Sequence, residues 1–377
     1  MHAELISDPA HFASLRPQWD ALYARSTART PFLSFAWLDA AWQWRRGSAE
    51  LYLLCVFDEH TLVGALPLVR ERIGSPALRV LEFLAVPYTQ HCDVLVAPEH
   101  TDVVADALSD ALAEHRQQWH VLRLRQLHVD GVATSALAAA LAHYGFATRV
   151  QFVTSNPQID LGGEWDAFYA SRSRRLRKAH NLAANRLARS GRCEVHWLAP
   201  DNRDAGAAQR ALATISDISA RSWKSATGNS LDDPRARAFA HRLLAHAQAL
   251  GWLSIWQLSL NGWPLAMEWQ LVEDGTVYAL CADFDASSGR LSPGSYLNSC
   301  LLERLFDARM RRYVMGPGDN PYKYRWCDGA CGIYSLTAYS DSATGRALAA
   351  WEGYVKPWLA RTRDPAHRQA KYRGAKR

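Results

Sequence analysis

The second half of the chain holds a dense group of side chains that could do acid–base chemistry. Residues 316–326 place an acid, a lysine, an arginine and three aromatic rings within eight positions, from Asp319 to Trp326. A reaction in which a nucleophile attacks needs a base nearby, and a carboxylate can serve as one. We expect this segment to contribute substrate-binding and catalytic groups to a cleft. The alternative is a structural turn closed by packed aromatic rings.

A second segment, residues 283–296, has the features of an anion-binding loop. It leaves the end of a predicted strand and enters a predicted helix through Ser292, Pro293, Gly294 and Ser295. Free N–H groups and the positive end of the helix dipole favour an anion at such a position. Glycine lets a ligand approach the backbone closely, and the two serine hydroxyls can add donors.

A third segment, residues 171–192, carries eight Lys and Arg residues and no acid. At helical spacing Leu176 and Leu187 lie on one stripe, whereas Arg175 and Lys178 lie on a cationic side. No acid at a spacing of four neutralises these charges. The helix is either a solvated surface helix or a clamp for phosphates of a cofactor, an anionic polymer or RNA.

The elements that must position these segments repeat in order along the chain. The first half is predicted to have strands at 51–57, 62–69, 77–84, 92–96 and 121–127, with helices at 102–118 and 135–143. The second half is predicted to have strands at 253–260, 265–272, 276–282 and 312–315, with a helix at 295–309. Because the order of elements is similar, we predict an α/β protein with domains at 1–165 and 166–360.

Composition excludes several classes of protein. The 377 residues are 49% hydrophobic and 21% charged, as in a globular protein, and no apolar run is long enough for a membrane helix. The first residues lack the pattern of a secretory signal, so we expect a cytoplasmic protein. Seven scattered cysteines and fourteen histidines show no zinc spacing, so we expect reduced thiols and no metal.

The positive net charge comes from the end of the chain. The last seventeen residues, 361–377, hold seven Lys and Arg and one Asp, which leaves 36 basic and 36 acidic side chains in residues 1–360. We predict a disordered basic tail that aids solubility, with contact to nucleic acid, an acidic polymer or anionic lipid as the alternative.

The chain resembles the CelD/BcsL group of proteins, which carry the BioF2-like acetyltransferase domain of the GNAT superfamily. The resemblance runs over residues 15–335 and is carried best by Asp319-x-x-Tyr322-Lys323-x-x-Trp326, which follows a Ser-Pro-Gly helix entry. Residues 30–37, 62–68 and 173–177, and the segment containing Asp93, are also similar. The resemblance implies two tandem GNAT-like domains, each a mixed, mostly antiparallel sheet flanked by helices, in a distant relative of the FemAB transferases.

The implied activity is acyl transfer, with acetyl-CoA or another acyl-CoA as co-substrate and an amine or hydroxyl as acceptor. In GNAT enzymes the pyrophosphate of the donor rests on the loop that corresponds here to residues 292–295. The usual Gln/Arg-x-x-Gly-x-Gly/Ala pattern is absent, because Arg290 is followed only by Gly294. We expect the acceptor to be a small molecule or a saccharide of exopolysaccharide, cellulose or cell-envelope metabolism.

The resemblance also assigns expected roles to individual residues. Asp319 or Asp283 is expected to be the base, with Glu268 in reserve, and Tyr322 is expected to protonate the leaving thiolate. The remaining candidates are expected to bind substrate, and they are Lys323, Trp326, Asp93, Arg175 and Lys178.

Other functions stay open at this point. A FemAB relative would use aminoacyl-tRNA, which the basic helix could bind, but the long helical arm of many FemAB proteins has no counterpart here. The protein could also be a non-catalytic accessory protein of polysaccharide assembly. The acyl group, the acceptor and the oligomeric state are not specified by the sequence.

Overall fold

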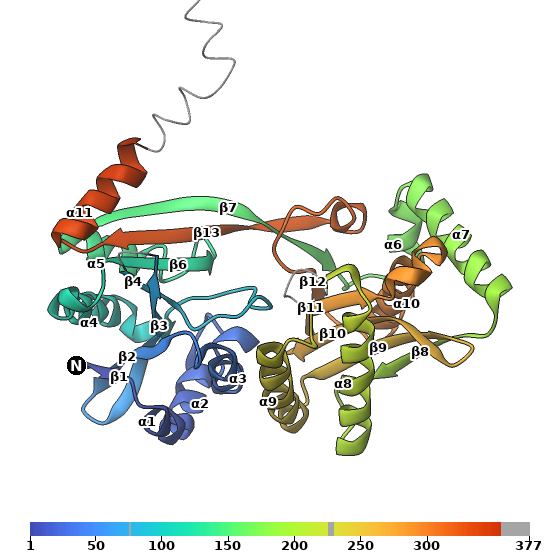
Figure 1. The fold of residues 1–377 in the computed structure, drawn as a ribbon, viewed down its shortest axis with the longest axis horizontal. Helices are drawn as coiled ribbons and strands as arrows, with labels where there is room; N and C mark the ends of the chain where they lie inside the picture. The colour runs from blue at the N-terminus through green and yellow to red at the C-terminus, as the bar shows by residue number, and fades with distance from the viewer. Residues whose placement is uncertain (75–76, 225–229, 356–377) are drawn as a thin grey trace, which may run out of the picture.

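The computed structural model describes residues 1–74, 77–224 and 230–355, and within them thirteen strands form one mixed sheet (Figure 1). The sheet order is β1-β2-β3-β4-β6-β13-β7-β12-β11-β10-β9-β8, and β5 pairs with β3. The first strands are β1 (His2–Ile6), β2 (Glu50–Asp58), β3 (Thr61–Ile73), β4 (Leu78–Phe83), β5 (Leu95–Val96), β6 (Val121–Leu127) and β7 (Ala147–Asp160). The later strands are β8 (Cys193–Leu198), β9 (Leu253–Leu260), β10 (Trp263–Glu273), β11 (Thr276–Phe284), β12 (Arg312–Val314) and β13 (Gly329–Tyr339).

Helices cover both faces of the sheet. Those of the first half are α1 (Pro9–Ser14), α2 (Arg16–Arg25), α3 (Phe35–Arg45), α4 (Thr101–Glu114) and α5 (Ala136–His143). Those that follow are α6 (Trp165–Ser171), α7 (Arg174–Ser190), α8 (Ala205–Ala220), α9 (Pro234–Leu250), α10 (Pro293–Asp307) and α11 (Ala343–Ala350). All strand pairs are antiparallel except β4 with β6 and β11 with β12, so the predicted α/β class with a mixed, mostly antiparallel sheet flanked by helices is confirmed.

Three apolar clusters make the core. One lies between β2–β6 and helices α4 and α5, and another lies between β9–β12 and helices α6, α7 and α10. The third includes side chains of α2, α3, α8 and α9 and therefore runs through both halves of the molecule. Trp37 of α3 packs edge-on against Phe239 of α9 with ring centroids 5.2 Å apart, so the two halves share buried aromatic surface.

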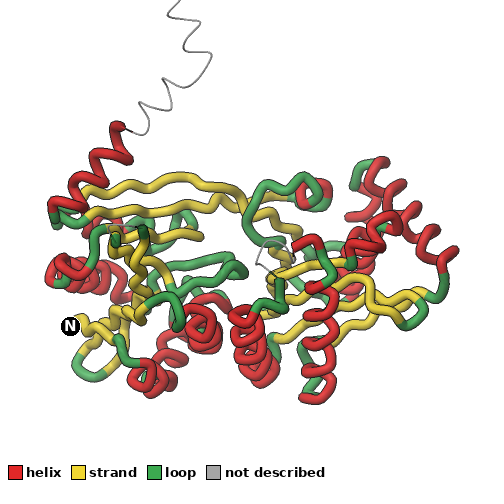
Figure 2. The backbone as a smooth tube through the Cα atoms, in the orientation of Figure 1, coloured by secondary structure: helices red, strands yellow, loops and turns green. Residues whose placement is uncertain are grey.

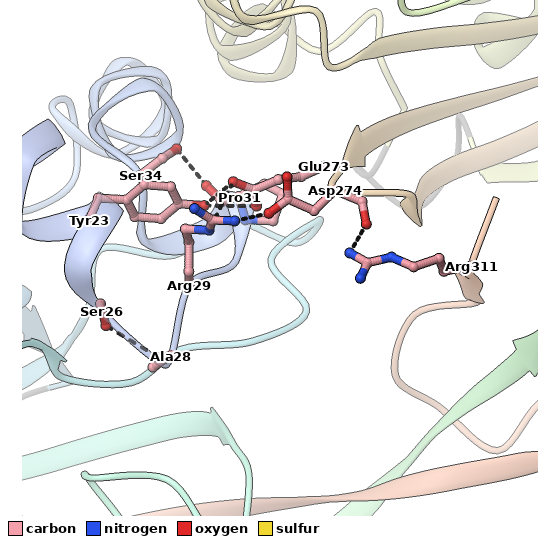
Figure 3. A network of polar contacts seen from close by, with 9 residues as sticks. All are labelled: Tyr23, Ser26, Ala28, Arg29, Pro31, Ser34, Glu273, Asp274 and Arg311. Carbon is pink, nitrogen blue, oxygen red and sulfur yellow. Dashed lines mark hydrogen bonds and ion pairs between the residues drawn. The ribbon is translucent and has the colours of Figure 1, made fainter. Parts of the chain in front are cut away.

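Polar contacts also join the halves (Figure 3). The hydroxyl of Tyr23 on α2 donates to both carboxylate oxygens of Glu273 at the end of β10, at 2.7 and 2.8 Å. Arg29 forms an ion pair with Asp274, whose carbonyl accepts from Arg311.

By its position in the sequence, β13 belongs to the second half of the chain, but it pairs with strands of the first half. It lies between β6 and β7, antiparallel to both, and Figure 2 shows β7 and β13 running side by side across the molecule. β7 then pairs with β12 through residues 158–160, which makes the sheet continuous. The domain boundaries at residues 165 and 360 stay a prediction, and the predicted basic tail at 361–377 lies outside the described residues.

One predicted strand is shorter than expected. Of residues 92–96 only Leu95 and Val96 pair as a strand. Asp93 instead uses its carboxylate to accept hydrogen bonds from the backbone N–H groups of Val94, Val132 and Ala133, at 2.7–3.0 Å. This holds the loop after β6 and takes the segment out of the strand ladder.

Candidate functional site

The parallel strands β11 and β12 separate soon after they begin. They pair only along residues 276–278 of β11, and from residue 279 to 284 no described strand lies on that side of β11. We call residues 279–284 the split edge. The register with β10 shifts between Trp269 and Gln270, which makes Leu280 an extra residue in β11. Such a β-bulge bends a strand and takes peptide groups out of the ladder.

Two side chains from other parts of the chain bind the split edge. Gln90, from the loop between β4 and β5, donates its amide to the carbonyl of Ala279 at 2.6 Å. Lys224, after α8, donates to the carbonyl of Ala282 at 2.8 Å and forms an ion pair of 2.7 Å with Asp283. The first half of the molecule therefore contributes directly to the site.

Glu268 on β10 is a buried acid beside this edge. It is 3% exposed, and its Oε1 accepts from the hydroxyl of Tyr313 on β12 at 2.6 Å and from the amide of Gln270 at 2.7 Å. No hydrogen bond from the described residues reaches Oε2. Burial raises the pKa of Glu268, although these two hydrogen bonds and the charge of Lys224 lower it. Glu268 thus combines a free oxygen with an increased affinity for a proton.

Asp283 on β11 is a buried acid of a different kind. Its Oδ2 accepts from the hydroxyl of Ser219 at 2.9 Å and lies 3.4 Å from the thiol of Cys281, while Lys224 is paired with its Oδ1. Burial alone would lower the pKa of Lys224, but Cys281 and Asp283 raise it overall. Asp283 is therefore bound on both oxygens and holds Lys224 at the split edge.

Asp319 lies on the surface. Its carboxylate accepts from the hydroxyl of Tyr324 at 2.6 Å and from Thr154 at 3.2 Å. The hydrogen bond from Tyr324 lowers the pKa of Asp319 most, so this carboxyl group stays ionised and has a low affinity for a proton. The structure does not place Asp319 with Glu268 and Asp283 in one contact network.

Of the other predicted site residues in segment 316–326, Lys323 and Trp326 are buried and Tyr322 is half exposed. Lys323 is buried, and its amine donates to the carbonyls of Gly316 and Pro317 at 2.7 and 3.1 Å. Burial lowers the pKa of Lys323 to about 8. Trp326 is also buried and stacks in the core against the rings of Trp165, Phe168 and Tyr169.

Tyr322 stands between these two environments. Its side chain is half exposed, yet partial burial, and secondly the nearby carboxylate of Glu268, raise its pKa to about 12. A phenol that keeps its proton at neutral pH can donate it.

The predicted anion-binding loop does begin a helix. Ser292 adopts the left-handed conformation (φ 56°), Pro293 is the first residue of α10, and Gly294 follows. A Cβ atom at Gly294 would lie 3.3 Å from the ring of Phe284, so a larger residue would have to displace that ring. Ser295 is exposed in the first turn, where helix N–H groups have no partner within the helix.

The cationic helix α7 lies against this loop. Arg186 donates to the carbonyl of Arg290 at 3.1 Å, which brings positive charge to the start of α10. Arg175 and Lys178 are exposed near the other end of α7. Asp93 is in the first half, where it binds backbone, and lies outside this group of contacts.

Sequence reasoning did not find Lys224, Gln90 or Tyr313. Each comes from a segment without a motif, and each reaches the site only through the tertiary contacts of β11 and β10. Among residues 1–74, 77–224 and 230–355, no group of three or more His, Cys, Asp or Glu residues is placed to hold a metal ion.

Comparison with known proteins adds a functional class to this geometry. Residues 172–324 match a family model described as an acetyltransferase (GNAT) domain. This match contains α7, the split edge, the start of α10 and Glu268, and it covers less than half of the chain. A search of curated protein sequences finds no match.

Three solved structures share the fold. FemX has a TM-score of 0.56 at 12% identity, over 94% of this chain and 100% of that chain. The C-terminal domain of a putative lysylphosphatidylglycerol synthetase from Agrobacterium fabrum has a TM-score of 0.53 at 13% identity, over 89% and 95%. A conserved protein of unknown function from Bacteroides thetaiotaomicron has a TM-score of 0.51 at 12% identity, over 89% and 99%. At these identities the likeness shows the fold alone.

The matched domain supports an enzyme of the acyltransferase class. No helix in the described part of the chain is long and apolar enough to span a membrane.

Proposed function

We propose that this protein transfers an acyl group, in the simplest case acetyl, from acyl-CoA to an amine or hydroxyl of an acceptor. The observation that carries the proposal is the buried Glu268 beside the split edge of β11, inside the segment that matches an acetyltransferase domain. A general base for acyl transfer needs a raised proton affinity and an oxygen open to the substrate; Glu268 has a raised pKa, and its Oε2 accepts no hydrogen bond from the described residues.

The proposed reaction is direct attack on the thioester. The nitrogen or oxygen of the acceptor forms a bond to the carbonyl carbon, and its proton passes to Oε2 of Glu268. The bond between carbon and sulfur breaks, and Tyr322 gives its proton to the departing thiolate. Peptide groups released from the ladder by the bulge at Leu280 can supply an N–H donor to the oxyanion that forms on the way. Tyr313 and Gln270 fix the orientation of the base.

The chain's own residues fit an anionic donor at the start of α10. The free N–H groups of the first turn, including those of Gly294 and Ser295, face a region to which Arg186 and Arg290 add positive charge. Arginine and helix N-termini are common partners of pyrophosphate oxygens. Positive charge from α7 would thus supply the anion binding that the usual GNAT phosphate-loop pattern, absent here, supplies in other enzymes of that class.

The finer assignment follows the resemblance to the CelD/BcsL group. We place the acceptor among saccharides or small molecules of exopolysaccharide, cellulose or cell-envelope metabolism, and the reaction in the cytoplasm, where acyl-CoA is available. Exposed Arg175 and Lys178 would then bind anionic groups of a substrate, and Asp283 would serve the site by holding Lys224.

One observation favours a second candidate, an aminoacyl-tRNA-dependent transfer as in FemAB proteins. The cationic face of α7 carries several exposed arginines in an unusually basic helix, which suits a nucleic-acid backbone. Calorimetric titration with tRNA at low and moderate salt tests it. Binding that weakens steeply with salt in the full chain, and is lost in Arg175→Gln/Lys178→Gln, would favour tRNA over acyl-CoA as the donor.

The experiment that tests the main proposal is calorimetric titration with acetyl-CoA and longer acyl-CoAs. We expect micromolar binding in the wild type and in Asp319→Asn, and a loss of binding in Gly294→Trp, whose side chain fills the space next to Phe284. Circular dichroism and thermal melting confirm that each variant is folded. If no acyl-CoA binds the wild-type protein, the acyl-CoA proposal is wrong.

A further inference from the structure

A cavity of about 330 Å³ lies where α3, β6 and the start of α9 meet, and no residue of the split edge lines it. Its lining includes Trp44, Arg45, Arg123, Arg125, Gln126 and Arg235. The volume is within the range of small-ligand sites. None of these residues has a part in the acyl-transfer site described above, so the cavity needs its own explanation.

The local backbone of β6 turns polar side chains toward the cavity. Gln126 has a positive φ of 56°, and the pairing of β6 with β13 shifts register between Tyr334 and Leu336. After this irregularity Leu127 joins Leu122 and Leu124 in the apolar cluster, while Gln126 lines the cavity together with Arg123 and Arg125. Regular alternation would have placed Gln126 on the apolar face. The bulge therefore adds an amide to an arginine-rich wall.

The charges of the wall do not cancel. Four arginines and two glutamates line the cavity. Both glutamates, Glu71 and Glu82, are bound by Arg45 at 2.7 and 2.6 Å. Within residues 1–74, 77–224 and 230–355, Arg123 and Arg125 form no ion pair and the buried Nε of Arg45 has no hydrogen-bond partner. N–H donors of the arginines therefore remain available on the cavity wall after both glutamates have paired with Arg45.

The cavity is joined to the acyl-transfer site by one short segment. Val86 and Pro87 line the cavity, and in the same loop Gln90 binds the split edge. Between them Tyr88 contacts Trp44 with ring centroids 5.9 Å apart, and its pKa is raised by burial and by the charges of Cys281 and Asp283. The wall of the cavity and the wall of the site are therefore neighbours.

We propose that this cavity is a binding site for the oxyanion of a small substrate, a phosphate or carboxylate attached to a sugar-sized body. Planar guanidinium groups bind both oxyanions through paired N–H donors, and Arg123, Arg125 and Gln126 present such donors together. Its use as an anchor for the acceptor rests on the proposed acyl transfer. The binding itself does not.

Calorimetric titration of the full chain, without any acyl donor, tests this site. The probes are glucose 1-phosphate, glucuronate and neutral glucose. We expect saturable binding of at least one of the charged sugars and none of glucose, and the tighter of the two identifies the oxyanion. In the double variant Arg123→Gln/Arg125→Gln the affinity should fall by about tenfold or more.

The matched control is Arg237→Gln. Arg237 is exposed on α9, close in sequence to Arg235 but outside the lining, so its loss should leave the affinity unchanged. The proposal is wrong if neither charged sugar binds saturably, or if the folded double variant binds as the wild type does. Because no acyl donor is present, a failure of acyl transfer does not affect this result.

Discussion

Carboxyl groups that look equivalent in the sequence end up in opposite environments. Glu268 is buried and bonded to Tyr313 of β12, with one oxygen that accepts no hydrogen bond from the part of the chain that the structure describes, whereas Asp319 is exposed and bound by Tyr324 and Thr154. The prediction of a general base at Asp319 rests on the density of functional side chains in the short motif around it. The tertiary contacts give the higher proton affinity to Glu268, which stands alone between apolar residues of a strand.

Glu268→Gln should remove most of the transferase activity. The change keeps the shape and the contacts of Oε1 but removes the proton acceptor, so kcat/KM should fall by about 10²- to 10⁴-fold. Because the pKa of Glu268 is raised, the wild-type rate should decline as the pH falls through that value, above the ~4.3 of an ordinary glutamate. Asp319→Asn is the control and should retain the wild-type pH–rate profile. A pH profile that shifts in Asp319→Asn and not in Glu268→Gln would assign the base to Asp319.

Lys323→Met should lower stability more than it affects acyl transfer. The amine of Lys323 satisfies two carbonyls, those of Gly316 and Pro317, inside the protein. Their loss of a partner should cost about 1–3 kcal/mol in the free energy of unfolding, measured by urea denaturation. A variant with wild-type stability and a raised KM for the acceptor would instead support the substrate-binding role predicted from the sequence.

At the scale of elements, the hydrophobic periodicity predicted part of the helices and strands, but it did not find the long strands β7 and β13 or the long helices α8 and α9. The predicted helix 295–309 is α10, Pro293–Asp307, and the predicted strands 253–260 and 265–272 are β9 and β10, which pair antiparallel. What periodicity cannot predict is pairing over a distance. The split between β11 and β12, the bulge at Leu280 and the position of β13 all depend on which strands meet.

The contact between α7 and the start of α10 gives a prediction for donor binding. Arg186→Gln removes a charge next to the loop of Arg290 and should raise the Kd for acyl-CoA about fivefold, as expected for one partly exposed charge. The effect should shrink at high salt, because exposed charges are screened. Arg189→Gln, on the same helix but with no hydrogen bond or ion pair to the described residues of this loop, should bind as the wild type does. Equal losses in both variants would indicate general charge attraction and not a defined site.

At the scale of the whole molecule, the two halves are built into one another. The aromatic cluster of α3 and α9, the contact of Tyr23 with Glu273 and the insertion of Gln90 at the split edge all cross between them. The repeat of element order along the sequence indicated two similar units, and it could not reveal these contacts because they depend on individual side chains that meet only in the folded chain. The split edge, which Gln90 binds, is therefore built from both halves.

The strand β13 makes the strongest test of this interdependence. A fragment of residues 1–165 would lack β13, so β6 and β7 would lose the strand that lies between them, and the apolar cluster would lose Leu336 and Ala338. Without β13, the facing edges of β6 and β7 have no strand to pair with, and part of the core is missing. Because both losses oppose folding, we expect this fragment not to unfold cooperatively on heating.

Residues 1–355 should show a cooperative transition, measured by circular dichroism. Co-expression of the fragment with residues 166–355 should restore it, since β13 can then enter from a separate chain. If the fragment alone melts cooperatively, β13 is an addition to a self-sufficient first domain, and the boundary near residue 165 predicted from the sequence is also a boundary of folding.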